Sequence, residues 1–229
     1  MVNNPADFFA FGAFFVVLQP KINQQLFEMK KIVTILAASM MLLGIDAIAQ
    51  PAVSAGYLRS IENTKVGSLS STQPTDGFYA GIDVTMPITE NLSFMPGIYY
   101  AMTSKKNVAS IWGLKIEGAR QTDHMINAPL MLNLGMDLSS DFRVFVYGGP
   151  TLSFGIASVY QTQNSSYNRY DSDDNLKRFD VMLGAGAGIE MMEKFRVTFG
   201  YDWGMLNRTS VSDVTVRRNQ MRVGVAFLF

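Results

Sequence analysis

The feature that most constrains the fold is a strict alternation of apolar with polar or small residues. Between residues 126 and 138 every even position is apolar, whereas the odd positions include Asn127, Asn133 and Asp137. Successive side chains of a strand point to opposite faces, so this period of two predicts strands. The same pattern marks segments 53–61, 78–88, 92–103, 142–156, 179–189, 195–205 and 218–229, and the weakest is 53–61, where Arg59 falls on the apolar register. No stretch after Gln50 keeps a helical period.

Strand length and loop length together favour a membrane barrel. Eight strands of about eleven residues match the length that crosses a bilayer at a tilt. Short links are expected at 89–91, 139–141 and 191–194, and long polar links at 62–76, 104–122, 160–177 and 208–215. Alternating short and long links are typical of outer-membrane barrels. The prediction is an all-β fold, an eight-stranded antiparallel up-and-down transmembrane β-barrel over residues 50–229, with its long loops outside the cell.

Alternation does not decide which face is inside, because a soluble barrel of the lipocalin kind also alternates. The less apolar face is rich in Gly, Ala and Thr and carries only one or two charges per strand, which suits a narrow lumen. Aromatic residues of the apolar face gather at the strand ends, as in the girdles of a membrane barrel. The predicted girdles comprise Phe94, Phe142 and Phe195 at the turn end, and Phe78, Tyr100, Phe179, Tyr201 and Trp203 at the loop end.

Charged residues on the lumen-facing register nearly balance. Desolvated charges persist when they are paired and hydrogen-bonded, so an interior ion-pair network is expected. Its predicted members are Asp83, Asp137, Arg143, Arg178, Asp180, Glu190, Arg196, Asp202, Arg218 and Arg222. Side chains just fill an eight-stranded barrel, so a closed barrel is expected rather than a diffusion pore.

The first 49 residues have the composition of a targeting segment. A basic start at residues 29–31, an apolar run from 32 to 43 and the Ala47-Ile48-Ala49 site predict a signal peptide over 29–49. Residues 1–28 are expected to be an upstream extension from a start codon that the cell does not use. A membrane anchor is the alternative, but the apolar run is shorter than a spanning helix needs.

Composition excludes several classes of function. Lys plus Arg and Asp plus Glu both number 19, which argues against a nucleic-acid binder. With no Cys and one His, thiolate and multi-histidine metal sites are excluded, and no cofactor is expected.

Three features were weighed as candidate sites. His124 lies where a long loop enters a strand, the place of a catalytic His in some lipid-modifying barrels, but no Ser lies two residues away. Residues 171–175 (DSDDN) offer oxygen ligands for Ca²⁺ but lack the Gly and Glu of an EF-hand loop. Loop aromatics suit contact with an extracellular protein or glycan. The candidates are Trp112, Tyr160, Tyr167 and Tyr170.

The chain ends Arg222-Val-Gly224-Val-Ala-Phe227-Leu-Phe229, which resembles the terminal signal by which outer-membrane barrels are recognised for assembly. Segments 76–81 (DGFYAG), 91–96 (NLSFMP), 127–130 (NAPL), 147–150 (YGGP) and 178–180 (RFD) resemble the outer-membrane β-barrel domain family common in Bacteroidota, the small porin-family or PorT-like proteins. The resemblance implies a bacterial outer-membrane location, contact with outer-membrane lipid and with the barrel-assembly machinery during insertion, and no catalytic residues.

The leading hypothesis is a closed, non-enzymatic barrel with a structural or surface-interaction role carried by its long loops. One alternative is a narrow channel or a barrel subunit of a secretion machine. Others are a lipid-modifying enzyme centred on His124 and a soluble periplasmic barrel.

Overall fold

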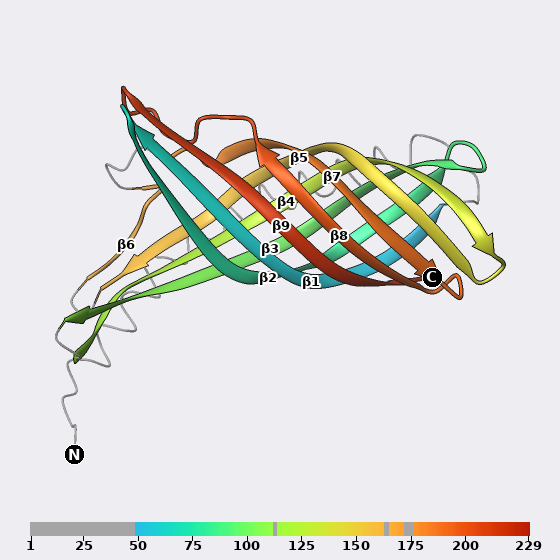
Figure 1. Ribbon diagram of the computed structural model, residues 1–229, viewed down its shortest axis with the longest axis horizontal. Helices are drawn as coiled ribbons and strands as arrows, with labels where there is room; N and C mark the ends of the chain where they lie inside the picture. The colour runs from blue at the N-terminus through green and yellow to red at the C-terminus, as the bar shows by residue number, and fades with distance from the viewer. Residues whose placement is uncertain (1–48, 112–113, 163–164, 172–175) are drawn as a thin grey trace, which may run out of the picture. The chain divides into compact units, whose positions relative to one another are not determined.

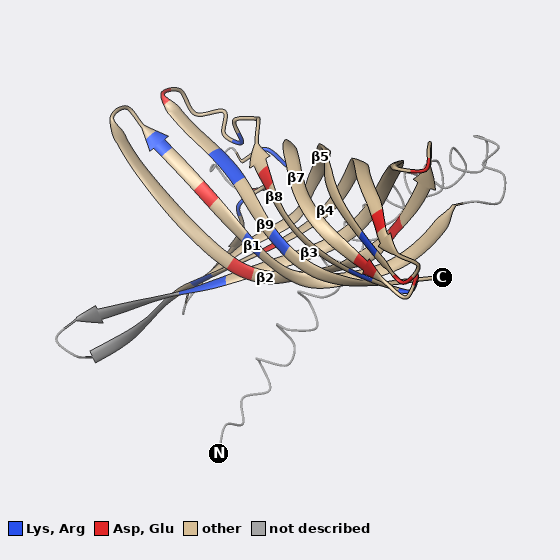
Figure 2. Cartoon of the chain, turned by 45° about the vertical axis from the view of Figure 1, so that its right-hand side comes forward, with Lys and Arg blue, Asp and Glu red and all other residues tan. Residues whose placement is uncertain are grey.

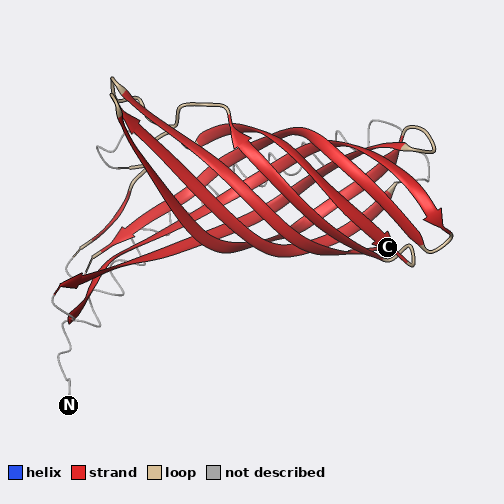
Figure 3. Cartoon of the chain, in the orientation of Figure 1, coloured by secondary structure: helices blue, strands red, loops and turns tan. Residues whose placement is uncertain are grey.

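A computed structural model describes residues 49–229 except 112–113, 163–164 and 172–175. For residues 107–111 and 114–118 it describes the backbone but not the side chains. The predicted upstream extension (1–28) and signal peptide (29–49) therefore lie outside the described residues, apart from Ala49. The described part is built from strands and loops (Figure 3). It contains no helix with the length and hydropathy of a membrane span.

Eight long antiparallel strands form a closed ring in the described part of the chain (Figure 1). Each strand pairs with the next along the chain, and β1 pairs with β9 to close the ring. The long strands are β1 (Gln50–Val66), β2 (Leu69–Pro87), β3 (Leu92–Ile111), β4 (Leu114–Ser139), β5 (Phe142–Gln161), β7 (Phe179–Met191), β8 (Phe195–Gly204) and β9 (Val214–Leu228). The short β6 (Ser166–Asn168) pairs only with β5. The predicted eight-stranded up-and-down topology is confirmed.

Two predicted loops are wrong. Residues 62–76 and 104–122 continue as strand pairs almost to their tips, where Val66 lies opposite Leu69 and Ile111 opposite Leu114. Gly67, with φ of 56°, makes the turn between β1 and β2. Residues 62–65 and 70–73 of the β1–β2 extension are polar on both faces, so the apolar alternation that revealed the other strands is absent there although the backbone is extended.

The apolar face points outward and the polar face points inward. Side chains such as Leu132, Leu134 and Val225 are exposed, whereas Asp180, Asp202 and Gln220 have no exposed surface. A soluble barrel has the opposite arrangement, with its apolar face inside. An apolar exterior around a polar interior is the arrangement of a membrane barrel.

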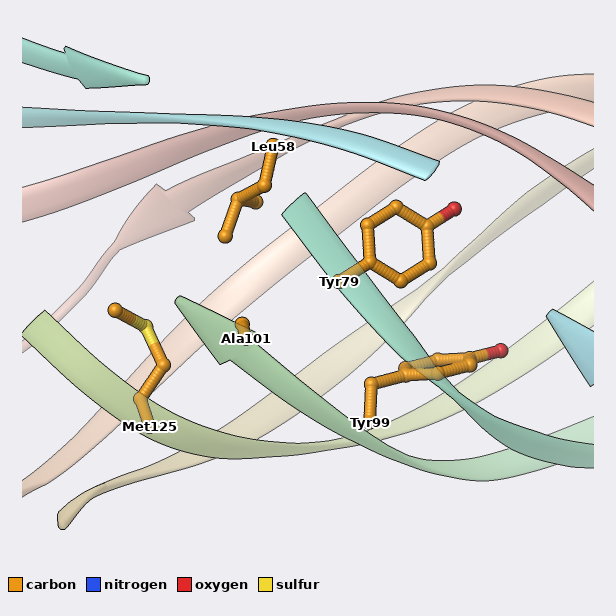
Figure 4. Packing of buried hydrophobic residues seen from close by; sticks show 5 residues of the cluster. All are labelled: Leu58, Tyr79, Tyr99, Ala101 and Met125. Atoms are coloured by element: carbon orange, nitrogen blue, oxygen red, sulfur yellow. The ribbon is translucent and has the colours of Figure 1, made fainter. Parts of the chain in front are cut away.

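Aromatic rings fill the lumen where inward glycines leave room. A Cβ atom at Gly200 would clash with the Tyr147 hydroxyl oxygen, and one at Gly224 would clash with the Tyr79 hydroxyl oxygen. Tyr79 and Tyr99 pack edge to face with ring centres 5.3 Å apart. Figure 4 shows both rings in one cluster with three smaller apolar side chains, Leu58, Ala101 and Met125. The Gly-rich inner face therefore accommodates large rings in a narrow barrel.

Candidate functional site: the filled lumen and its hairpin end

Charged residues occur on the strands along the length of the barrel (Figure 2), and inward-pointing ones meet in three clusters. The turn-end cluster is centred on Arg196 of β8. Its guanidinium donates to Asp83 and Glu190 at 2.7 Å each and to the hydroxyl of Thr85 at 2.6 Å. Arg196 and Asp83 are each 2% exposed.

The second carboxylate oxygen of Asp83 also accepts hydrogen bonds. The hydroxyls of Ser54 and Tyr99 donate to Asp83 Oδ2 at 2.5 and 2.7 Å. Two hydroxyl donors and one guanidinium at hydrogen-bond distance compensate for the burial of this carboxylate. The turn-end cluster thus ties β1, β2, β3, β7 and β8 together across the lumen.

The middle cluster joins Arg222 of β9 to Asp202 of β8. Arg222 Nε lies 2.8 Å from Asp202 Oδ2, and Arg222 Nη2 donates to Asp202 Oδ1 at 3.0 Å. The Thr151 hydroxyl donates to the same Oδ1 at 3.1 Å. Between this cluster and Arg196 lies a cavity of about 30 Å³, which Tyr79, Tyr99 and Tyr147 help to line. A cavity of this size holds one or two waters and no larger solute.

The hairpin-end cluster closes the opposite end of the lumen. Asp180 lies 3.5 Å from Arg218 and 3.8 Å from Arg208, and Arg208 also donates to Glu62 at 3.1 Å. Arg208 lies in the loop between β8 and β9. Burial by itself lowers the pKa of Arg208, but its acidic neighbours, Tyr170, Glu62 and Asp180 among them, raise that pKa above its ordinary value.

Other charges that the sequence assigned to the lumen lie at its two rims. Arg143 donates to Asp137 at 3.0 Å at the turn end, where the Asp137 side chain is 66% exposed. Arg178 pairs with the exposed Asp171 at 2.7 Å at the hairpin end. Asp171 is therefore engaged by a cation, and residues 172–175 of the candidate Ca²⁺ loop lie outside the described residues. Within the described part of the chain no group of three or more His, Asp or Glu could hold a metal ion.

The girdle aromatics all lie on the outward register. Tyr201 and Trp203 pack with ring centres 5.0 Å apart at the hairpin end, and Phe195 and Phe227 are 5.6 Å apart at the turn end. The structure adds outward aromatics that the sequence analysis did not single out. They are Tyr57, Phe154 and Phe199.

The candidate loop contacts separate into different environments. Tyr160 and Tyr167 pack with ring centres 5.5 Å apart across β5 and β6, and Tyr167 is 42% exposed. Tyr170 instead turns into the barrel, where its hydroxyl accepts from Arg208 at 3.2 Å and its ring lies under the Arg178 guanidinium. Tyr170 is thus part of the closure of the lumen. Trp112 lies outside the described residues.

His124 lies on the outward face of β4. Its Nδ1 is 2.6 Å from the hydroxyl oxygen of Tyr100. The nearby hydroxyl of Ser104 hydrogen-bonds the hydroxyl of Thr122 at 3.1 Å.

The residues of the terminal assembly signal lie on β9, which closes the ring, except for Phe229, which directly follows β9. Phe227 and Phe229 point outward with ring centres 5.1 Å apart, whereas Arg222 points inward. Two members of the interior clusters, Glu62 and Arg208, were missed because both fell in predicted loops. If β1 is extended as far as Glu62, alternation places this side chain on the inward face, and this was the one signal that could have revealed it.

One family model matches the chain, and several solved structures are similar to it. The family model described as "Outer membrane protein beta-barrel domain" matches residues 52–209. Similar solved structures include Ail, the attachment invasion locus protein of Yersinia pestis, at 12% identity and a TM-score of 0.41, covering 80% of this chain and 100% of that one. Neisserial surface protein A is 16% identical with a TM-score of 0.44 and the same coverage.

OprG from Pseudomonas aeruginosa is 10% identical with a TM-score of 0.44, covering 79% of this chain and 96% of that one. No curated protein matches the chain. The apolar exterior, the closed ring and the family match place this protein in the bacterial outer membrane. The chain belongs to the outer membrane protein beta-barrel domain family.

Proposed function

We propose that this protein is a closed, non-catalytic barrel that presents its protruding strands to an extracellular protein. The observation that carries the proposal is that several strands extend beyond the closed ring. Pairing between β2 and β3 ends at Asp76 and Ser104, whereas β1–β2 and β3–β4 continue pairing to their tips. Beyond that point β1, β2 and β9 stay paired as one sheet, whereas β4 keeps its pairing with β5 to Arg120 and then continues with β3 alone as a ribbon. The sheet and the ribbon diverge (Figure 1).

The divergence leaves strand edges without a neighbour in the described part of the chain. Residues 69–75 of β2 pair only with β1, and residues 105–111 of β3 pair only with β4. Unpaired backbone N–H and C=O groups are a template for an added strand, the mode by which many proteins bind an extended peptide. This chemistry supports a protein partner over a glycan. The exposed Tyr167 beside Tyr160 adds aromatic contact area at the same end.

A filled lumen supports the closed state over a channel. Three ion-pair clusters cross the interior, and the cavity between two of them is about 30 Å³. In planar bilayers the protein is expected to give no conductance steps, and reproducible steps would defeat this part of the proposal. The motif resemblance supports a narrower proposal, that the chain belongs to the porin-family or PorT-like branch common in Bacteroidota.

The binding role is tested by trimming the ribbon. Residues 107–119 are replaced by Asn-Gly, which joins the paired Lys106 and Arg120 as a two-residue hairpin turn and leaves the ring pairs untouched. Cells producing each protein are compared for adhesion to a panel of immobilised extracellular proteins. The trimmed variant should keep its heat-modifiable band on gels and lose most of the adhesion. Equal adhesion by both proteins, or none by either, would contradict the proposal.

A further inference from the structure

We infer that residues 69–75 of β2, here called the β2 edge, pair strand to strand with the same residues of a second copy of this chain on a facing membrane. The inference rests on the proposed function and names one partner for the protruding strands. In the described part of the chain, one side of the β2 edge pairs with β1 and the other side has no neighbouring strand. The segment is exposed from Leu69 to Gln73, and Leu69 is 77% exposed. A second strand can therefore reach it.

The other protruding edges in the described part of the chain carry the protection that sheet edges usually have. Both unpaired edges of the ribbon, 105–111 of β3 and 114–119 of β4, include charged residues. The side of β9 that faces away from β1 is covered by Asn207, whose side chain makes two hydrogen bonds of 2.9 Å to the β9 backbone. The short β6 has only three residues. Charges, a covering loop and short length all hinder the addition of another sheet. The β2 edge has no charged residue, and its one protective residue is Pro74, near its base.

Pro74 shows which backbone groups of β2 face the open side. Pro74 lies opposite Ile61 of β1 and has no N–H, so this pair does not exchange backbone hydrogen bonds. In an antiparallel pair, hydrogen-bonded and non-hydrogen-bonded positions alternate, so Ser70 and Thr72 also point their N–H and C=O groups away from β1. The β2 edge thus offers two N–H donors, from Ser70 and Thr72, and three carbonyl acceptors, from Ser70, Thr72 and Pro74.

These groups complement themselves in an antiparallel pair centred on Thr72. The Thr72 N–H of each copy donates to the Thr72 carbonyl of the other, and the Ser70 N–H of each copy donates to the Pro74 carbonyl of the other. The N–H that Pro74 lacks leaves only the Ser70 carbonyl without a strand partner, and water can donate to it. Two identical edges related by a two-fold axis form such an isologous contact. Because the β2 edge is uncharged, the two copies do not repel each other.

The membrane decides which copies can pair in this way. A two-fold axis along the membrane normal relates two barrels of one membrane, and strands tilted by about 40° would then cross at about 80°. A two-fold axis parallel to two facing membranes makes the strands antiparallel instead. Thr72 lies six residues beyond the girdle residue Phe78, which is about 15 Å along the normal at about 3.3 Å per residue and that tilt. Two facing apolar bands would therefore lie about 30 Å apart, with room for both headgroup layers of about 5–7 Å each.

The test mixes two sets of lipid vesicles that contain the barrel and carry different dyes, and it scores two-colour clusters as the protein density is varied. Thr72→Pro removes the outward N–H, as the native Pro74 does two residues away, and keeps the hydrogen bonds to β1. The matched control Thr72→Ala loses the same side-chain hydrogen bond to Asn63 but keeps the N–H. A backbone hydrogen bond contributes about fivefold in affinity and symmetry removes two, so Thr72→Pro should weaken each contact about thirtyfold. The number of contacts grows with the square of the protein density, so Thr72→Pro should need a density about fivefold higher to cluster, whereas Thr72→Ala should match the wild type.

Wild-type vesicles should cluster with each other and leave protein-free vesicles single. The inference would be overturned by an absence of wild-type clusters, by clusters that include protein-free vesicles, or by Thr72→Pro clusters at the wild-type density. The barrel trimmed at residues 107–119 keeps the β2 edge and should cluster as the wild type does. Ribbon-dependent adhesion without vesicle clusters would overturn this inference and leave the proposed function intact. A heat-modifiable band from each variant shows that the barrel has folded.

Discussion

Removal of Arg196 should be among the most damaging single changes in the barrel. The Arg196→Met substitution keeps a long side chain but deletes three hydrogen bonds of 2.6–2.7 Å. It leaves Asp83 (2% exposed) and Glu190 (15% exposed) without their shared cation. Breaking a buried ion pair from one side costs about 3–5 kcal/mol, so the free energy of unfolding should fall by about 4 kcal/mol.

The triple variant Arg196→Met/Asp83→Asn/Glu190→Gln separates charge burial from loss of packing. With no charge left in the cluster, the free energy of unfolding should recover to within about 1–2 kcal/mol of the wild type. The assay is urea-dependent equilibrium folding in lipid vesicles, followed by tryptophan fluorescence and gel mobility. Arg217→Met, at an exposed outward position of β9, is the control and should change stability by less than about 0.5 kcal/mol. The reasoning is refuted if Arg196→Met costs under about 1 kcal/mol, or if the triple variant is no more stable than Arg196→Met.

Three more predictions concern packing, lipid contact and assembly. Gly200→Ala should lower the free energy of unfolding by about 1–3 kcal/mol in the same assay, because its Cβ would meet the Tyr147 hydroxyl. Adding Tyr147→Phe should restore the stability, and failure of this rescue would contradict the prediction. Leu132→Arg, in the middle of the apolar outward face, should lower the free energy of unfolding by about 2–4 kcal/mol, whereas His124→Arg, at the edge of that face, should lower it by about 0–1 kcal/mol. Equal losses would argue that the apolar face is not the one that contacts lipid. Deletion of Phe229 should lower outer-membrane yield in cells while leaving refolding in vesicles unchanged, and a loss of both would indicate a purely structural role.

The sequence predicted the barrel because the membrane-facing strands obey one simple rule. Lipid outside and a narrow polar lumen inside impose opposite demands on alternate residues, so the period of two is clear from residue 126 to residue 138. Where β1 and β2 extend past the ring, both faces are polar and the period carries no information. The strand from Glu62 to Val66 was therefore predicted as a loop.

Parity on a strand predicts which way a side chain points but not its partner. Arg196 and Glu190 point into the lumen, and their convergence with Asp83 depends on the register between strands far apart in sequence. Tyr170 illustrates a further limit. Its loop has no periodicity, and only the tertiary structure shows that the ring packs against Gly155 and places its hydroxyl at Arg208.

The pairing of β1 with β9 has a consequence for the order of events during biogenesis. Ala52 lies opposite Leu228, so the seam of the ring joins the two ends of the barrel segment. Contacts so distant in sequence form slowly, because the whole intervening chain must first be confined. Until β9 has been synthesised and delivered, both β1 and β8 carry open edges and the apolar exterior has no lipid to cover it. The nascent chain must therefore be kept unfolded and shielded from water throughout its passage to the membrane.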